Sequence, residues 1–102
     1  MLKVYAVCPG GVGTSLVLKQ NLITLFEEKN IPAEVGFMGG WEVGKTEFDL
    51  CFVIGYVYEN VLNALSEDDA RRERIMRVSG VMDMDELSRT IDRAISALPL
   101  QD

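Results

Sequence analysis

The sequence has no histidine, and only two of its 102 residues are cysteines. It therefore contains no Cys/His set that could hold a metal ion, and it has no Cys-x-x-Cys pair. The apolar stretch before Cys8 is also too short for a secretory or lipoprotein signal. Few cysteines and no export signal predict a cytoplasmic protein with reduced thiols.

Basic residues and long apolar runs are scarce as well. The chain has 10 Lys and Arg against 16 Asp and Glu, which gives a formal charge of −6. Because nucleic acids and anionic membranes attract clustered cations, we expect neither as a partner. Arg71, Arg72 and Arg74 are interleaved with acidic residues and predict a solvated face. The longest apolar run, residues 50–58, is about half of the roughly 20 residues that cross a bilayer, so no direct membrane insertion is expected.

The residues that are present form the pattern of a small α/β protein. A chain of 102 residues predicts one domain, residues 1–102, with a single modest core. Apolar, β-branched runs indicate strands, and apolar residues at i, i+4 and i+7 indicate helices. The expected strands are residues 2–8, 33–38, 49–54 and 74–78, and the expected helices are residues 13–29, 56–66 and 83–98. Residues 39–48 are expected to form a loop or a short turn.

Strands that alternate with helices predict a three-layer sandwich with a central four-stranded parallel sheet, a Rossmann-like α/β fold. Asn30 and Pro32 are expected to end the first helix, and Asp83 with Glu86 predicts a capping box at the start of the last one. Ligands of such sheets bind beyond the carboxyl ends of the strands. The loop between the first strand and the first helix lies at that edge and is the predicted phosphate loop.

The stretch VCPGGVGTSLVLK, residues 7–19, joins a cysteine to a glycine-rich helix start. Main-chain N–H groups in such a loop, together with a helix N-terminus, bind an oxyanion. The same donors favour a thiolate over a thiol, so Cys8 is the candidate nucleophile. The predicted phosphate-binding residues are Gly10, Gly11, Val12, Gly13, Thr14 and Ser15. The alternative is that Cys8 is a small core residue before a tight turn.

The spacing Cys-x5-Thr-Ser resembles two families. Low-molecular-weight tyrosine phosphatases have Cys-x5-Arg-Ser; here Thr14 stands at the arginine position, so the bidentate phosphate partner is missing and poor phosphatase activity is expected. The closer resemblance is to the IIB component (EIIB) of sugar phosphotransferase systems (PTS), of the ascorbate and galactitol type. The matching residues are Cys8, Gly11, Gly13, Thr14 and Ser15, and the LVLK stretch up to Lys19 continues the likeness. Pro9 stands where the family usually has glycine.

This resemblance implies a phosphotransferase with no cofactor and no metal. Cys8 would accept phosphate from a phosphohistidine of the A component (EIIA) and pass it to a sugar bound in the membrane C component (EIIC). Because the chain has no histidine, the donor must be another protein or domain. Two alternatives remain open: a phosphatase or arsenate-reductase-like enzyme, and a diverged, non-catalytic anion-binding regulatory module.

Two further signals predict structure rather than chemistry. The segment GGWEVGKT, residues 39–46, satisfies the Walker A pattern, but Thr46 is followed by Glu47, Phe48 and a strand instead of a helix, so no nucleotide site is expected. Cys51 lies within an apolar strand and is expected to be buried and inert. In neighbouring parallel strands it would lie on the order of 10 Å from Cys8, too far for a disulfide.

Overall fold

The structure is a computed structural model that describes residues 1–8, 12–80 and 82–97. The elements in chain order are β1 (Leu2–Cys8), α1 (Val12–Glu28), β2 (Ala33–Gly39), η1 (Gly40–Lys45), β3 (Leu50–Ile54), η2 (Gly55–Val57), α2 (Tyr58–Asn63), η3 (Ala70–Arg74), β4 (Ile75–Val78) and α3 (Met84–Ala97). The four expected strands are confirmed, with β1 having the expected bounds.

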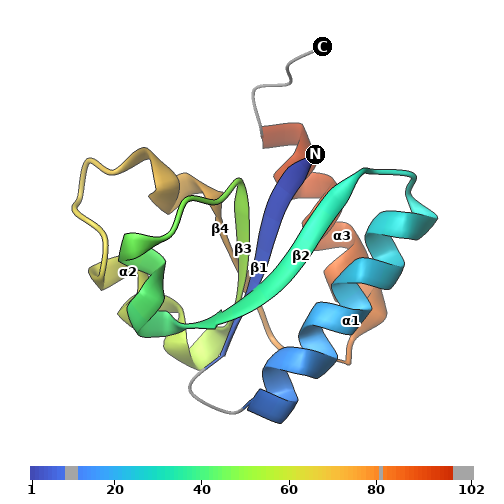
Figure 1. Ribbon diagram of the computed structural model, residues 1–102, viewed down its shortest axis with the longest axis horizontal. Coiled ribbons are helices and arrows are strands. Elements are labelled where there is room, and N and C mark those ends of the chain that lie inside the picture. Colours follow the sequence, from blue (N-terminus) through green and yellow to red (C-terminus); the bar gives the residue numbers. More distant parts are fainter. Residues whose placement is uncertain (9–11, 81, 98–102) are drawn as a thin grey trace.

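The four strands form one parallel sheet in the order β2-β1-β3-β4. Helices α1 and α3 pack together on one face of the sheet, and α2 lies on the opposite face (Figure 1). The expected three-layer α/β sandwich is therefore confirmed. Its parallel strands are connected by crossovers that place helices on both faces, which is why the strands are buried and strongly apolar.

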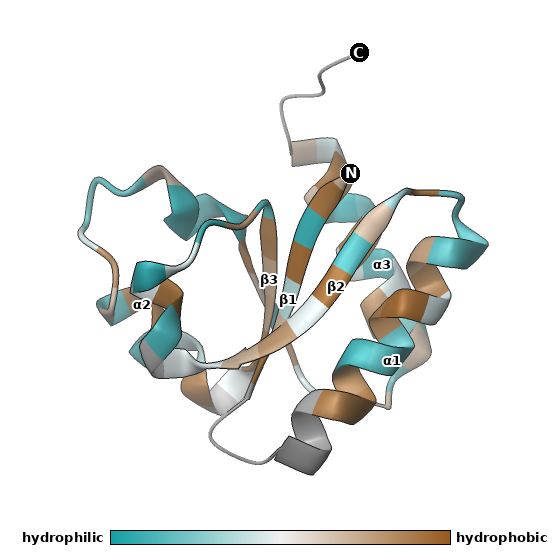
Figure 2. Ribbon diagram, in the orientation of Figure 1, coloured by the Kyte–Doolittle hydropathy of each residue, from teal (hydrophilic) through white to brown (hydrophobic). Residues whose placement is uncertain are grey.

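The core occupies both sides of the sheet. All five residues of β3 are buried, and this strand is hydrophobic along its length (Figure 2). On the face covered by α1, the rings of Phe26 and Phe52 meet edge to face with centroids 6.5 Å apart. The other large, fully buried side chains include Leu18 and Leu22 of α1 and Leu87 and Ile91 of α3. These helix residues recur at the i, i+4 spacing that the sequence showed.

The predicted helix ends are partly correct. Asn30 adopts a left-handed conformation (φ 57°) after α1, and the Ile31 N–H donates to the Phe26 carbonyl, as in a helix C-cap. Asp83 caps α3 by accepting a hydrogen bond from the Glu86 N–H at 3.0 Å. The reciprocal half of the expected capping box is wrong, because the Glu86 carboxylate instead accepts from the Ser79 N–H at 3.0 Å and the Ser79 hydroxyl at 2.8 Å.

The expected helix over residues 56–66 is shorter than predicted. It consists of the 3-10 turn η2 followed by α2, which ends at Asn63. Arg72 lies against this end: its Nη1 donates to the carbonyls of Leu62 at 2.7 Å and Leu65 at 3.1 Å. A cation on the last carbonyls of a helix stabilises the point at which it ends. The segment expected to be a loop or a short turn contains the 3-10 helix η1.

The sequence predicted that Arg71, Arg72 and Arg74 form a solvated face. This prediction is wrong for Arg71 and Arg72. Arg71 pairs with Asp69 at 2.7 Å, and these side chains are only 24% and 19% exposed. Arg71 also donates to the Thr46 carbonyl at 2.9 Å and lies over the Phe48 ring, 6.0 Å from its centroid. Arg72 caps α2. The charge pattern could not reveal this, because η3 turns both guanidinium groups toward segments distant in sequence.

The Asp69–Arg71 pair predicts an acid-sensitive contribution to stability. Hydrogen bonds from the side chain and the main chain of Arg71 lower the pKa of Asp69 to about 2. The unfolded-state pKa is higher, about 3.9, so the pair stabilises the fold above that pH and the stabilisation is lost as the pH falls from about 4 to about 2. Urea unfolding of Asp69→Asn should show lower stability at neutral pH and a smaller loss across this window.

Asp68→Asn is the matched control, because Asp68 is exposed and lies next to Asp69. This control should behave like the wild-type protein at every pH. An Asp69→Asn protein whose stability falls between pH 4 and 2 as steeply as that of the wild type would contradict the assignment.

Candidate functional site

The carboxyl ends of the four strands meet at one edge of the sheet, and Cys8 ends the strand at its centre. Cys8 pairs with Gly39, the last residue of β2. On the other side Val7 pairs with Val53, so Cys8 is level with Ile54 at the end of β3. The chain continues from β1 to β2 on one side of the sheet and reaches β3 on the other. The edge between β1 and β3 is thus a topological switch point, where open α/β sheets bind ligands.

The structure brings the main chain of Cys8 and the start of α1 to this edge. The predicted residues Val12, Gly13, Thr14 and Ser15 form the first turn of the 17-residue helix α1. The first N–H groups of a helix lack an acceptor within it, and they carry the positive end of the helix dipole. The first turn of α1 contains no acidic residue that would compete for them. Gly10 and Gly11, together with Pro9, lie outside the described residues.

Two cations near this edge were not singled out by charge clustering. The Lys19 ammonium lies over the Phe37 ring, 5.7 Å from its centroid. Arg77, in β4, lies with its guanidinium beside Gly55, the first residue after β3. Arg77 lies one residue before the end of β4, the strand with the weakest sequence pattern. Because ligands of parallel sheets bind beyond the carboxyl ends of the strands, this position is the sequence signal that could have identified Arg77. Leu16 and Phe37 are also exposed here, at 45% and 41%.

Polar groups of the Walker-like segment, residues 39–46, form hydrogen bonds with one another. The Gly39 N–H, which a phosphate loop would direct at a ligand, donates to the Glu42 carboxylate at 3.0 Å. The Thr46 hydroxyl donates to the Glu42 carbonyl at 2.8 Å. The Glu42 carboxylate therefore already accepts the hydrogen bond from the Gly39 N–H that a bound phosphate would need.

Cys51 has the properties expected of a buried thiol. It is fully buried and free, so it takes no part in a disulfide. Burial raises its pKa well above the ordinary range, and the positive charge of Arg71 offsets only part of this effect. Cys51 pairs with Tyr5, three residues before Cys8 in β1, which corresponds to about 10 Å at 3.3 Å per residue. Cys51 is therefore not a candidate nucleophile.

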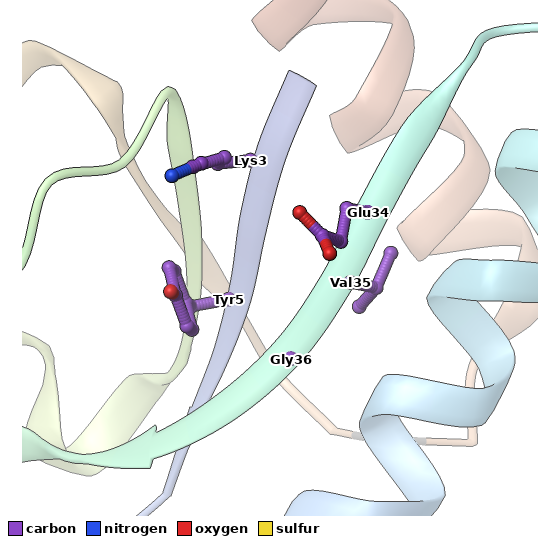
Figure 3. Close-up of a pocket in the computed structure, with 5 residues that line it drawn as sticks. All are labelled: Lys3, Tyr5, Glu34, Val35 and Gly36. Carbon is purple, nitrogen blue, oxygen red and sulfur yellow. The ribbon is translucent and has the colours of Figure 1, made fainter. Parts of the chain in front are cut away.

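A shallow pocket of about 230 Å³ lies away from this edge, over the amino-terminal halves of β1 and β2 (Figure 3). Its lining residues are Lys3, Tyr5, Glu34, Val35 and Gly36. The Tyr5 ring covers Gly36 so closely that a Cβ at Gly36 would lie 3.2 Å from it. This packing gives the pocket a structural explanation, and none of the predicted site residues lines it.

Neither a metal centre nor a membrane helix is found in the part of the chain that the structure describes. Within residues 1–8, 12–80 and 82–97, no three His, Cys, Asp or Glu side chains are grouped so that they could hold a metal ion. Among the same residues, no helix has the length and apolar character needed to span a membrane.

Comparison with known proteins shows a likeness of fold. No protein-family model matches the sequence, and no curated protein matches it. Among solved structures, it is similar to the lactose-specific IIB component domain of the phosphoenolpyruvate:carbohydrate phosphotransferase system from Streptococcus pneumoniae. The TM-score is 0.56 at 19% identity, with 93% of this chain and 91% of that chain covered. The chain thus has the fold of a IIB component, while the motif resembled the ascorbate and galactitol type.

The two cysteines should differ in reactivity with iodoacetamide. Cys8 should react with an apparent pKa below the roughly 8.5 of a free thiol, because N–H donors favour its thiolate. Cys51 should react only when the protein unfolds, because it is buried and its pKa is raised. Peptide mass spectrometry after alkylation across a pH series measures both. An ordinary pKa at Cys8, or rapid labelling of Cys51 in the folded protein, would contradict these assignments.

Proposed function

We propose that this protein is a phosphocarrier, the IIB component of a sugar phosphotransferase system of the ascorbate or galactitol type. Cys8 accepts a phosphoryl group from a phosphohistidine of an A component and passes it to a sugar bound in a membrane C component. The observation that carries the proposal is the end of β1 at Cys8 beside the start of α1, within a fold similar to that of a IIB domain. We infer a cytoplasmic location for the whole domain, residues 1–102.

The first transfer moves phosphorus from nitrogen to sulfur. The Cys8 thiolate attacks the phosphorus of the phosphohistidine, an S–P bond forms, and the N–P bond breaks. The electron pair of the broken bond returns to the imidazole nitrogen of the donor. The N–H groups of residues 10–15 hold the phosphoryl oxygens during this step, as oxyanion donors do in other transferases.

The second transfer moves phosphorus from sulfur to oxygen. A hydroxyl oxygen of the sugar attacks the phosphorus, an O–P bond forms, the S–P bond breaks, and the thiolate of Cys8 is restored. The hydroxyl proton passes to a base or to water at the sugar site. Because sugar contacts belong mainly to the membrane component, this chain supplies the phosphoryl group and its orientation.

The electrostatics of the edge suit a group that remains anionic throughout. A thiolate and a phosphorylated sulfur are both negative, so the same N–H donors and the same helix dipole stabilise the states before and after transfer. The first turn of α1 opposes neither state, since it carries no carboxylate. A phosphatase is not favoured, because Thr14 stands where phosphatases place the arginine that clamps the transition state.

Phosphorylation at Cys8 is the direct test of the proposal. Incubation with a phosphohistidine-bearing A component should give a stable phosphate adduct by intact mass. The adduct should be lost in Cys8→Ser and retained in Cys51→Ser, because Cys51 is buried. Release of free phosphate from aryl phosphates would instead indicate a phosphatase. Absence of both the adduct and turnover would indicate a non-catalytic anion-binding module.

Pro9 provides a second test of the loop. Proline lacks an N–H, so it removes one potential phosphate donor and fixes φ at that position. If residues 10–15 supply the donors, Pro9→Gly should phosphorylate Cys8 at an equal or higher rate, at a modest cost in conformational entropy. The initial rate of adduct formation measures this. A tenfold loss, about 1.4 kcal/mol of barrier, would mean that proline itself shapes the working loop.

A further inference from the structure

β2 forms an open edge of the sheet. The strand order β2-β1-β3-β4 leaves one side of β2 without a neighbouring strand. Figure 1 looks onto this edge, with β2 in front, α1 on one side of the sheet and α2 on the other. β2 has seven residues and no proline, whereas β4, at the opposite edge, has only four residues. A long edge strand without proline is a template for pairing with another chain.

The unpaired main-chain groups of this edge belong to alternate residues. The Leu2 N–H donates to the Pro32 carbonyl at 3.2 Å, so residue 32 and every second residue after it face β1. Ala33, Val35 and Phe37 therefore turn their N–H and C=O groups outward, and among the described residues these groups have no partner. These three residues are symmetric about Val35. A second β2 that runs antiparallel and crosses at Val35 pairs Val35 with its own copy and Ala33 with Phe37.

The two-fold axis through Val35 also passes beside the middle of α1. The Lys19 ammonium lies over the Phe37 ring, and α1 runs antiparallel to β2. Four helix residues span about 6 Å and two strand residues about 6.6 Å, so Ile23 is level with Val35. Because α1 packs on both β1 and β2, the axis places the two α1 helices about two strand spacings, roughly 10 Å, apart. This is the separation of packed helices.

The side chains along α1 complement themselves across the same axis. Lys19, Ile23 and Glu27 recur at every fourth residue and so form one row on the helix. When two such rows run antiparallel, Lys19 faces Glu27 of the second copy and Ile23 faces Ile23. Neither Lys19 nor Glu27 forms an ion pair within the described part of one chain. The two intermolecular pairs offset part of the repulsion between chains that each carry a charge of −6.

We propose that β2 and α1 form the interface of a symmetric homodimer, in which the two sheets join at β2 into one continuous sheet. The occupant of the edge is a second copy of this chain, because the free main-chain groups and the charged row of α1 are both self-complementary about one axis. The interface also covers Phe37, which is 41% exposed in the single chain and lies against Ala33 of the second copy. The inference does not depend on the proposed phosphocarrier function.

Sedimentation equilibrium over a series of protein concentrations tests the dimer. The wild-type protein should approach twice the monomer mass as its concentration rises. Phe37→Lys places a charge on the edge and should raise the dissociation constant roughly tenfold, because edge lysines oppose strand pairing. Met82→Lys is the matched control: it makes the same kind of change at another exposed apolar residue and should leave the constant unchanged.

A charge exchange tests the antiparallel arrangement of α1. Lys19→Glu or Glu27→Lys alone places like charges opposite each other twice per dimer and should raise the dissociation constant roughly tenfold. The double variant restores opposite charges in exchanged positions and should recover most of the wild-type affinity. Glu28→Lys is the control, because it makes the same charge change about 100° around the helix from Glu27.

A cysteine on the two-fold axis tests the register. In a Cys8→Ser background, Ile23→Cys places a thiol opposite its own copy, so mild oxidation should give a disulfide-linked dimer by intact mass. Thr24→Cys is the control, because the next residue of the helix faces away from the row. Cys51 does not interfere, since it is fully buried. Thermal unfolding checks that every variant remains folded.

Three results would overturn the inference. The first is a wild-type protein that stays monomeric at every concentration. The second is a dimer whose dissociation constant is the same in Phe37→Lys and in the wild type, because such a dimer uses another surface. The third is a double charge variant that remains as weak as Lys19→Glu alone, together with equal cross-linking of Ile23→Cys and Thr24→Cys.

Discussion

β1 is hydrogen-bonded to β2 on one side and to β3 on the other, and this double pairing determines where Cys8 lies. Asp49 sets the register with β3: the Lys3 N–H donates to its carboxylate, and its own N–H donates to the Lys3 carbonyl, both at 2.8 Å. Because helices cover both faces of the sheet, a shift of one residue would exchange the buried side chains that pack on its two faces. Val4, Ala6 and Val7 are fully buried, so their burial opposes such a shift.

The cations of this acidic protein differ in how many contacts they make within the fold. Some hold the fold together: Arg71 and Arg72 connect η3 to the preceding loop and to α2, and Lys29 joins α1 to α3 through a 2.9 Å ion pair with Asp92. Arg77, by contrast, is exposed and has no hydrogen bond or ion pair with the residues that the structure describes.

The likeness to a IIB domain and the motif around Cys8 are independent lines of support. The structural similarity extends over 93% of the chain but, at 19% identity, carries only the fold. The motif around Cys8 indicates phosphoryl transfer through a thiol, but it is short. Many unrelated activities share open α/β sheets, so function must be argued from the site itself. The end of β1 at the switch point and the acid-free start of α1 are the features of the site on which the proposed carrier function rests.

Local sequence determined the elements and the position of the candidate nucleophile. Apolar periodicity located the strands and the long helices, and the cysteine before a glycine-rich helix start identified the edge at which Cys8 lies, because both signals arise from neighbouring residues. The contacts that the side chains of Arg71, Glu86 and Arg77 make were determined only by the tertiary structure. Each of their contacts joins segments separated by a turn or a strand, and charge patterns along the chain do not encode which distant carbonyl, amide or glycine a long side chain will reach.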